Sequence, residues 1–149
     1  MKLLKWLSVS DRLAKKELDL RLAPLGINSS QHMYLLKVCD QPGILQESFI
    51  NSFYVHPSNI VRMIATLEKN GFLIRKPWEK DKRTWCLYPT QRALDIVGQI
   101  RTACQETETA LTAGLSAEER ELLAGMLFRT GKQLARQLNI ERMEDEFDE

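Results

Sequence analysis

The spacing of apolar residues divides the chain into helical segments on either side of one short extended region. From residue 3 to residue 22 apolar side chains recur at close to helical spacing, and Pro24-Leu25-Gly26 ends this first long helix. Asn28 and Gln31 then have the spacing of an N-cap residue and its reciprocal partner. The short helices predicted next are His32 to Cys39, Gln46 to Phe53 and Pro57 to Lys69.

After Gly71 the period changes from helical to extended. Residues 72–77 and 84–88 are rich in β-formers, and the charged stretch 78–83 separates them. This pattern predicts a two-stranded hairpin with a polar tip. It is the only β structure that we expect.

The helical period returns at Thr90 and continues to about Gly114. A last helix opens with the capping box Ser116-x-x-Glu119, and residues 141–149 form an acidic tail. Three short helices followed by a hairpin make a winged helix-turn-helix. The predicted fold is therefore mainly α with a small β-wing.

The long helices at both ends carry apolar stripes that a chain of this size cannot cover on its own. We expect one domain over residues 1–149, with a winged helix-turn-helix lobe at 28–90. Residues 1–25 and 91–140 are predicted to be dimerisation helices, so a second copy of the chain is an expected partner.

Composition excludes several classes of protein. The 149 residues are 44% hydrophobic and 28% charged, which is ordinary for a globular protein. Charged residues interrupt the apolar N-terminus, so we expect a cytoplasmic protein with no membrane contact. His32 and His56 lack acidic or cysteine neighbours at ligand spacing, and no catalytic motif is present. Neither a metal, a cofactor nor an enzyme activity is predicted.

Charge is distributed unevenly along the chain. Residues 1–92 hold 15 Lys and Arg against 8 Asp and Glu, a net charge of +7, whereas residues 93–149 carry −6. Within the first part, residues 62–92 hold 8 basic and 3 acidic residues. Such a basic segment on a nearly neutral chain is typical of a face that meets phosphates, so double-stranded DNA is the expected partner.

The helix from Ser58 to Lys69 has one packing face and one polar face, with Ser58 and Asn59 placed to enter a groove first. At the tip of the following hairpin, Arg83 could insert into a minor groove, with Asp81 orienting its guanidinium. The candidate DNA-binding residues are Ser58, Asn59, Arg62, Thr66, Lys69, Arg75, Lys82 and Arg83.

The order and spacing of several short motifs resemble the MarR family of winged helix-turn-helix regulators, especially its SlyA-like members. The resemblance covers nearly the whole chain. It is carried by Val55-x-Pro57-Ser58-x-x-x-Arg62, Leu67-Glu68-Lys69-x-Gly71-Phe72-Leu73-Ile74-Arg75, Asp81-Lys82-Arg83 and Leu87-x-x-Thr90.

This resemblance implies a dimer that binds a palindromic operator, with Ser58, Asn59 and Arg62 contacting DNA from the helix and Arg83 from the wing. We expect such a regulator to act as a repressor and to be released by a small aromatic ligand. The residues expected to line that ligand's cleft are Trp6, His32 and Met33.

Two alternatives to this function stay open at the level of sequence. A winged helix can serve as a protein-interaction module, which the acidic C-terminal part would favour. Because some family members respond to oxidants, Cys39 and Cys104 could make this chain a redox-switched regulator. With an odd number of cysteines and no C-x-x-C motif, reduced thiols are the simpler prediction.

Overall fold

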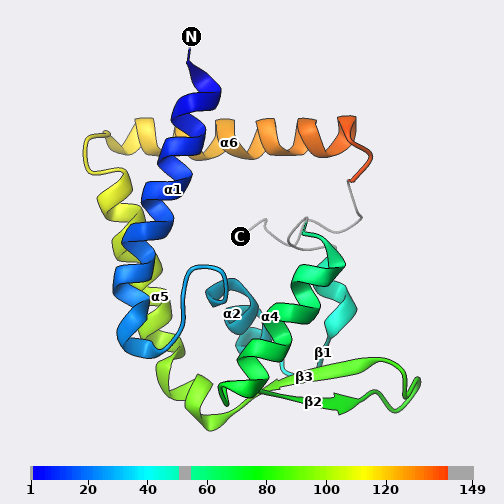
Figure 1. The fold of residues 1–149 in the computed structure, drawn as a ribbon. Coiled ribbons are helices and arrows are strands. Elements are labelled where there is room, and N and C mark those ends of the chain that lie inside the picture. Colours follow the sequence, from blue (N-terminus) through cyan, green and yellow to red (C-terminus); the bar gives the residue numbers. More distant parts are fainter. Residues whose placement is uncertain (1, 51–54, 141–149) are drawn as a thin grey trace.

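In a computed structural model the chain is mainly helical, with a small antiparallel sheet at one end (Figure 1). The structure describes residues 2–50 and 55–140, so the predicted acidic tail and the end of the third predicted helix lie outside the described residues. The elements are α1 (Leu3–Leu22), η1 (Ala23–Leu25), α2 (His32–Asp40), β1 (Ile44–Leu45), η2 (Gln46–Ser48), α4 (Pro57–Lys69), β2 (Leu73–Pro77), β3 (Trp85–Pro89), α5 (Gln91–Leu111) and α6 (Ala117–Gln137).

The predicted capping box of the last helix is confirmed, and the helix before it is capped by a hydroxyl as well. Ser116 Oγ accepts a hydrogen bond from Glu119 N, and the Glu119 carboxylate accepts one from Ser116 N at 2.8 Å. The Thr90 hydroxyl likewise accepts from Ala93 N at the start of α5. Each contact satisfies a backbone N–H that the helix itself leaves without an acceptor.

The second helix begins later than its predicted cap. Gln31 Oε1 accepts from Asn28 N at 3.1 Å as the capping box requires, but Asn28 Oδ1 accepts from Ser30 N. Residues 29–31 form a turn, and Ser29 N donates to Asp19 on α1 at 2.7 Å. Helix α2 itself starts at His32, with Gln31 as its N-cap residue.

The sheet has three strands where we expected two. Its order is β1-β3-β2, with Ile44 opposite Leu87 and Leu45 opposite Cys86. A two-residue strand has no detectable period, so only its pairing with β3 reveals it. The prediction that the hairpin is the only β structure was therefore wrong.

The segment predicted as a third helix from Gln46 begins as a 3₁₀ turn, η2, and residues 49–50 are α-helical. Phe49 is fully buried, and its ring centroid lies 5.3 Å from that of Tyr34 on α2. This aromatic contact anchors the segment to the core.

One hydrophobic core lies where α2, η2, α4 and the sheet meet the end of α1 and the first half of α5. Both long helices contribute buried residues to this core. The end of α1 and the first half of α5 are therefore part of the lobe, and the rest of each helix extends beyond it. The fully buried large side chains are Leu22, Leu35, Val38, Phe49, Ile60, Ile64, Leu67, Phe72, Leu73, Leu87 and Ile100.

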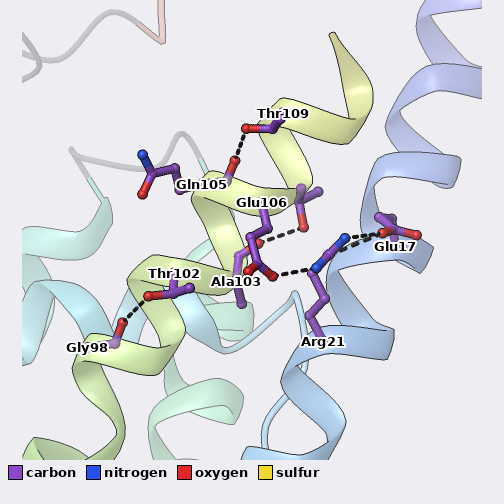
Figure 2. A network of polar contacts seen from close by, with 9 residues as sticks. Glu17, Arg21, Gly98, Thr102, Ala103, Gln105, Glu106 and Thr109 are labelled. Carbon is purple, nitrogen blue, oxygen red and sulfur yellow. Dashed lines mark hydrogen bonds and ion pairs between the residues drawn. The ribbon is translucent and has the colours of Figure 1, made fainter. Parts of the chain in front are cut away.

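Helices α1 and α5 pack side by side, and one arginine bridges them (Figure 2). Arg21 on α1 donates to Glu17 in its own helix and to Glu106 on α5. Nearby on α5, the hydroxyls of Thr102 and Thr109 donate to backbone carbonyls one turn earlier. This face of α5 therefore presents satisfied polar groups next to an inter-helix ion pair.

The other end of the molecule leaves its apolar residues uncovered. Helix α6 begins near the far end of α5 and runs across the end of the molecule opposite the sheet (Figure 1), and along its described length only Ala135 is buried. None of the helices in the described ranges is both long and apolar enough to cross a membrane. The exposed large apolar side chains at this end are Leu3, Leu4, Trp6, Leu7, Leu122, Leu123, Met126, Leu127, Phe128, Leu134 and Leu138.

Candidate nucleic-acid interface

Local sequence fixes both ends of α4, the predicted recognition helix. His56 is the N-cap, and its Nδ1 accepts a hydrogen bond from Ser58 N at 3.2 Å, while Pro57 occupies the first helical turn. After Asn70, Gly71 adopts φ 78°, a left-handed conformation that glycine tolerates without strain. The helix therefore ends in a sharp turn that leads directly into β2.

The two faces of α4 separate as the sequence predicts. Ile60, Ile64 and Leu67 are buried in the core. On the opposite side, Ser58, Arg62 and Lys69 are exposed, and Asn59 and Thr66 are half-buried at its edge. Five of the predicted DNA-binding residues thus share one solvent-facing side of one helix.

Contacts within the helix orient several of these side chains. Ser58 Oγ lies 2.7 Å from His56 Nδ1, and Arg62 Nη2 donates to Asn59 Oδ1. Thr66 Oγ1 donates to the Arg62 carbonyl at 2.9 Å. The Asn59 amide nitrogen therefore points away from Arg62, and the pair presents hydrogen-bond donors of the kind that read base edges.

At the tip of the wing, Asp81 holds Arg83 as predicted. One carboxylate oxygen of Asp81 accepts from Arg83 N at 3.0 Å and from Arg83 Nε at 3.1 Å. Hydrogen bonds from the Arg83 side chain, and secondarily from its backbone, lower the pKa of the Asp81 carboxyl. The Arg83 side chain is nevertheless 91% exposed, and Lys82 beside it is exposed too.

Cations also lie over the aromatic rings of the hairpin. Lys76 Nζ is 5.1 Å from the centre of the Tyr88 ring, and Lys80 Nζ is 5.6 Å from that of Trp78. Such pairs hold the long side chains against the hairpin while their charge stays at the surface. Lys76 and Lys80 therefore add positive charge to the wing, although neither was among the predicted DNA-binding residues.

Arg75 is placed differently from the other predicted DNA-binding residues. Its Nε and Nη2 each donate to a different carboxylate oxygen of Glu68, both at 3.0 Å. These hydrogen bonds are the main cause of the lowered pKa of Glu68. The guanidinium also lies 5.0 Å from the centre of the Trp85 ring, so two of its five N–H donors and one of its faces are already engaged.

A second arginine joins the end of α4 to α5. Arg92 donates to the Asn70 carbonyl at the C-cap of α4, and its guanidinium stacks 4.4 Å from the centre of the Phe72 ring. Thr90 Oγ1 donates to the Gly71 carbonyl at 2.7 Å. The recognition helix and the first turn of α5 are therefore bonded at one junction.

The structure does not bring the three predicted effector residues together within one chain. His32 is half-buried and bonded to Ser29 near the end of α1, and burial lowers its pKa. Trp6 lies 13 residues before Asp19 on the same helix, about 20 Å along the helix axis. Met33 is 43% exposed next to His32, and Trp6 is 60% exposed at the far end.

The cysteine and metal candidates can also be placed. Burial raises the pKa of the Cys39 and Cys104 thiols, which disfavours the reactive thiolate. Over residues 2–50 and 55–140, no three His, Cys, Asp or Glu side chains are grouped as a metal site would require. Neither class of chemistry has a developed site in this part of the chain.

Reasoning from sequence missed three residues at this interface. His56 acts as a helix cap, a role for which histidine gives no strong signal. Glu68 holds Arg75, and Val61 is 54% exposed on the side of α4 that faces the wing. The seven-residue separation of Glu68 and Arg75 can be read from the sequence. That the two side chains form an ion pair follows only from the geometry of the turn at Gly71.

Comparison with known proteins places this interface in a family. The model of the MarR family matches residues 27–85, which include α2, α4 and the wing up to the start of β3. The uncharacterized HTH-type transcriptional regulator YybA of Bacillus subtilis (strain 168) is 26% identical over 118 residues, covering 79% of this chain and 79% of that protein.

Solved structures of similar fold extend the likeness to the terminal helices. The transcriptional regulator SlyA superposes with a TM-score of 0.86 at 25% identity, covering 95% of this chain and all of that one. A protein from Listeria monocytogenes described as a MarR family regulator, solved with 26mer DNA, gives 0.81 at 22% identity and 95% coverage of both chains. Residues 27–85 therefore match the MarR family, and the chain as a whole shares the fold of MarR and SlyA-like winged helix-turn-helix transcriptional regulators.

Proposed function

We infer that this regulator is a repressor that binds a palindromic operator as a dimer. Each protomer would place α4 in a major groove and the wing in the adjacent minor groove, with half-sites about 34 to 36 Å apart. The observation that carries this proposal is the shared solvent-facing side of α4, followed at the wing tip by an exposed Arg83 held by Asp81.

Different contacts are assigned to different side chains. We propose that Asn59 and Arg62 read base edges, and that Ser58, Thr66 and Lys69 contact the backbone beside them. Lys82 and Arg83 would enter the minor groove, where the negative potential is strongest. For Arg75 a direct phosphate contact has less support, because Glu68 already binds its guanidinium.

Dimerisation is the second part of the proposal. The exposed apolar side chains of α6 and of the first half of α1 need a partner surface, and a second copy supplies the same stripes by symmetry. The relative position of the two lobes then decides whether both recognition helices fit successive grooves. The DNA complex of the Listeria protein supports this mode by analogy of fold.

Release by a small aromatic ligand is the third part. A ligand that prefers a lobe separation unsuited to DNA would shift the population away from the operator-bound state. We place this ligand near His32 and Met33, at the boundary between α1 and the lobe. The position of Trp6 fits the dimer contact better, since it lies about 20 Å along α1 from Asp19, the residue that contacts the turn before His32.

The test uses a duplex that the wild-type protein selects from a random pool. Arg62→Ala and Arg83→Ala should each weaken binding by about 5- to 150-fold, because each removes a direct DNA contact. Affinity is measured by fluorescence anisotropy at several salt concentrations. Loss of a phosphate contact should also reduce, by about one, the slope of the logarithm of the binding constant against the logarithm of the salt concentration.

Arg129→Ala is the matched control, since it removes one positive charge from α6, far from the lobe. It should bind the selected duplex as the wild type does. Wild-type affinity of both Arg62→Ala and Arg83→Ala at matched salt would exclude the assigned binding mode. Failure of the wild type to select any sequence would favour a winged-helix module that binds protein.

A further inference from the structure

We propose that Glu68 and Arg75 form a brace that sets the position of the wing relative to the recognition helix. On this proposal both are positioning residues, and neither contacts DNA. The inference rests on the proposed function, because it explains how α4 and the wing reach adjacent grooves together.

The geometry of the pair makes it suitable as a brace. Two parallel N–H···O bonds, both 3.0 Å long, fix the plane of the Arg75 guanidinium against the Glu68 carboxylate. The same guanidinium lies over Trp85, which faces Pro77 across the hairpin. A single side chain therefore links α4, β2 and β3.

At this distance from the core, the hairpin is paired with β1 along its β3 edge, where Ile44 and Leu45 face Leu87 and Cys86, and the Glu68–Arg75 pair ties it to α4. Beyond Arg75 the hairpin residues Lys76, Pro77, Lys82 and Arg83 are exposed. In the described part of the chain, the Glu68–Arg75 pair is the outermost hydrogen-bonded tie between α4 and the hairpin. A pocket lies between the N-terminal half of α4 and the hairpin, so close packing does not fix the wing there; its lining includes Pro57, Val61, Arg83 and Trp85.

The length of the wing amplifies any change at the brace. From Arg75 to Pro77 the strand extends about 7 Å and the turn of residues 78–84 lies beyond it, so a rotation of about 10° at the brace moves the tip by more than about 1 Å. A displacement of that size breaks hydrogen bonds at the tip. Arg83 can therefore lose its proposed contact with the DNA minor groove while its hydrogen bonds to Asp81 stay intact.

The charge of Glu68 allows a test in which the two explanations predict opposite changes in DNA affinity. Glu68 is an acidic residue next to Lys69 on a helix that meets phosphates, so electrostatics alone predicts tighter DNA binding when its charge is removed. The brace predicts the opposite result, because removing the carboxylate frees the wing. The two explanations therefore differ in the direction of the effect.

The first experiment compares Glu68→Gln with Glu79→Gln on the duplex selected by the wild type. Glu79 is an exposed residue of the wing, so its substitution removes the same charge without touching the brace. We expect Glu68→Gln to bind about five- to tenfold more weakly and Glu79→Gln to bind at least as tightly as the wild type. Hydroxyl-radical footprinting should show minor-groove protection lost for Glu68→Gln and major-groove protection kept.

A charge swap separates a brace from a direct contact. Arg75→Glu alone should weaken binding strongly, and adding Glu68→Arg should restore most of the affinity because the pair forms again with reversed polarity. If Arg75 bound a phosphate itself, the double variant would stay as weak as Arg75→Glu. Circular dichroism checks that each variant is folded, and Glu68→Gln provides a second test if the swap does not fold.

Two results would overturn the inference: binding of Glu68→Gln at wild-type strength or tighter, or a swap that restores nothing. Both require a wild-type protein that selects a specific duplex. A wild type that selects none contradicts the proposed function instead, so the two failures are distinguishable.

Discussion

In the lobe formed by α2, β1, η2, α4, β2 and β3, large side chains such as Phe49, Phe72 and Leu87 are completely buried, whereas α6 buries only Ala135 along its described length. Both regions contain helices with an apolar stripe. The difference is that the lobe finds its apolar partners within one chain and α6 does not. An amphipathic pattern therefore identifies a helix, but only the burial of its apolar face shows whether a single chain is enough to cover that face.

The largest expected effect comes from breaking the lobe. Phe72→Ala should reduce the free energy of unfolding by about 3–5 kcal/mol, because it removes a fully buried ring and leaves a cavity. The equivalent truncation Phe128→Ala, at a ring 49% exposed on α6 in the single chain, should cost less than about 1 kcal/mol at a protein concentration low enough for the monomer. Urea unfolding of both variants at one protein concentration measures the contrast, and equal losses would contradict it.

Breaking α6 should change association instead. Leu127 is 49% exposed, and Leu127→Asp should weaken dimerisation by about 100-fold, since a charge would replace an apolar contact between protomers. Arg129→Gln changes the charge by the same amount at a position about 200° around the helix from Leu127, and should leave the dimer intact. Sedimentation velocity over a range of concentrations gives both constants; a Leu127→Asp protein that stays dimeric would place the interface elsewhere.

The smallest effect probes the boundary between the two regions, where His32 is half-buried beside the end of α1. Burial lowers its pKa, so the unfolded chain binds a proton at a higher pH than the folded chain does. Stability should fall as pH drops below the ordinary value of 6.5 and continue to fall down to the lower folded-state pKa. Chemical unfolding from pH 7.5 to 5.5 should show a steeper loss for the wild type than for His32→Gln; parallel curves would assign the loss to other groups.

Sequence alone was sufficient for the long elements and for the division of α4 into a buried and a solvent-facing side. Helical spacing, Pro57 at a helix start, Gly71 after its end and the capping box at Ser116 are local signals, and the structure confirms each of them. The Asp81–Arg83 contact was also predictable, because it joins residues two apart. Caps, turns and contacts of this kind are determined by residues close to one another in the sequence.

What sequence missed depends on contacts between distant segments. Strand β1 exists because β3 offers a partner to Ile44 and Leu45. Arg75 looked like one more DNA-facing cation until the turn at Gly71 brought Glu68 against it. Residue type and spacing identify a charge, but only the fold identifies its partner.

The uncovered state of α6 has a consequence for when this regulator can act. A helix of 21 residues with one buried side chain gains little from its own chain, so on the proposed dimer its ordering and the arrival of the second copy are one event. At low abundance the DNA-competent species then grows with the square of the number of chains. A small change in synthesis would produce a large change in operator occupancy, which gives the gene a threshold without any ligand.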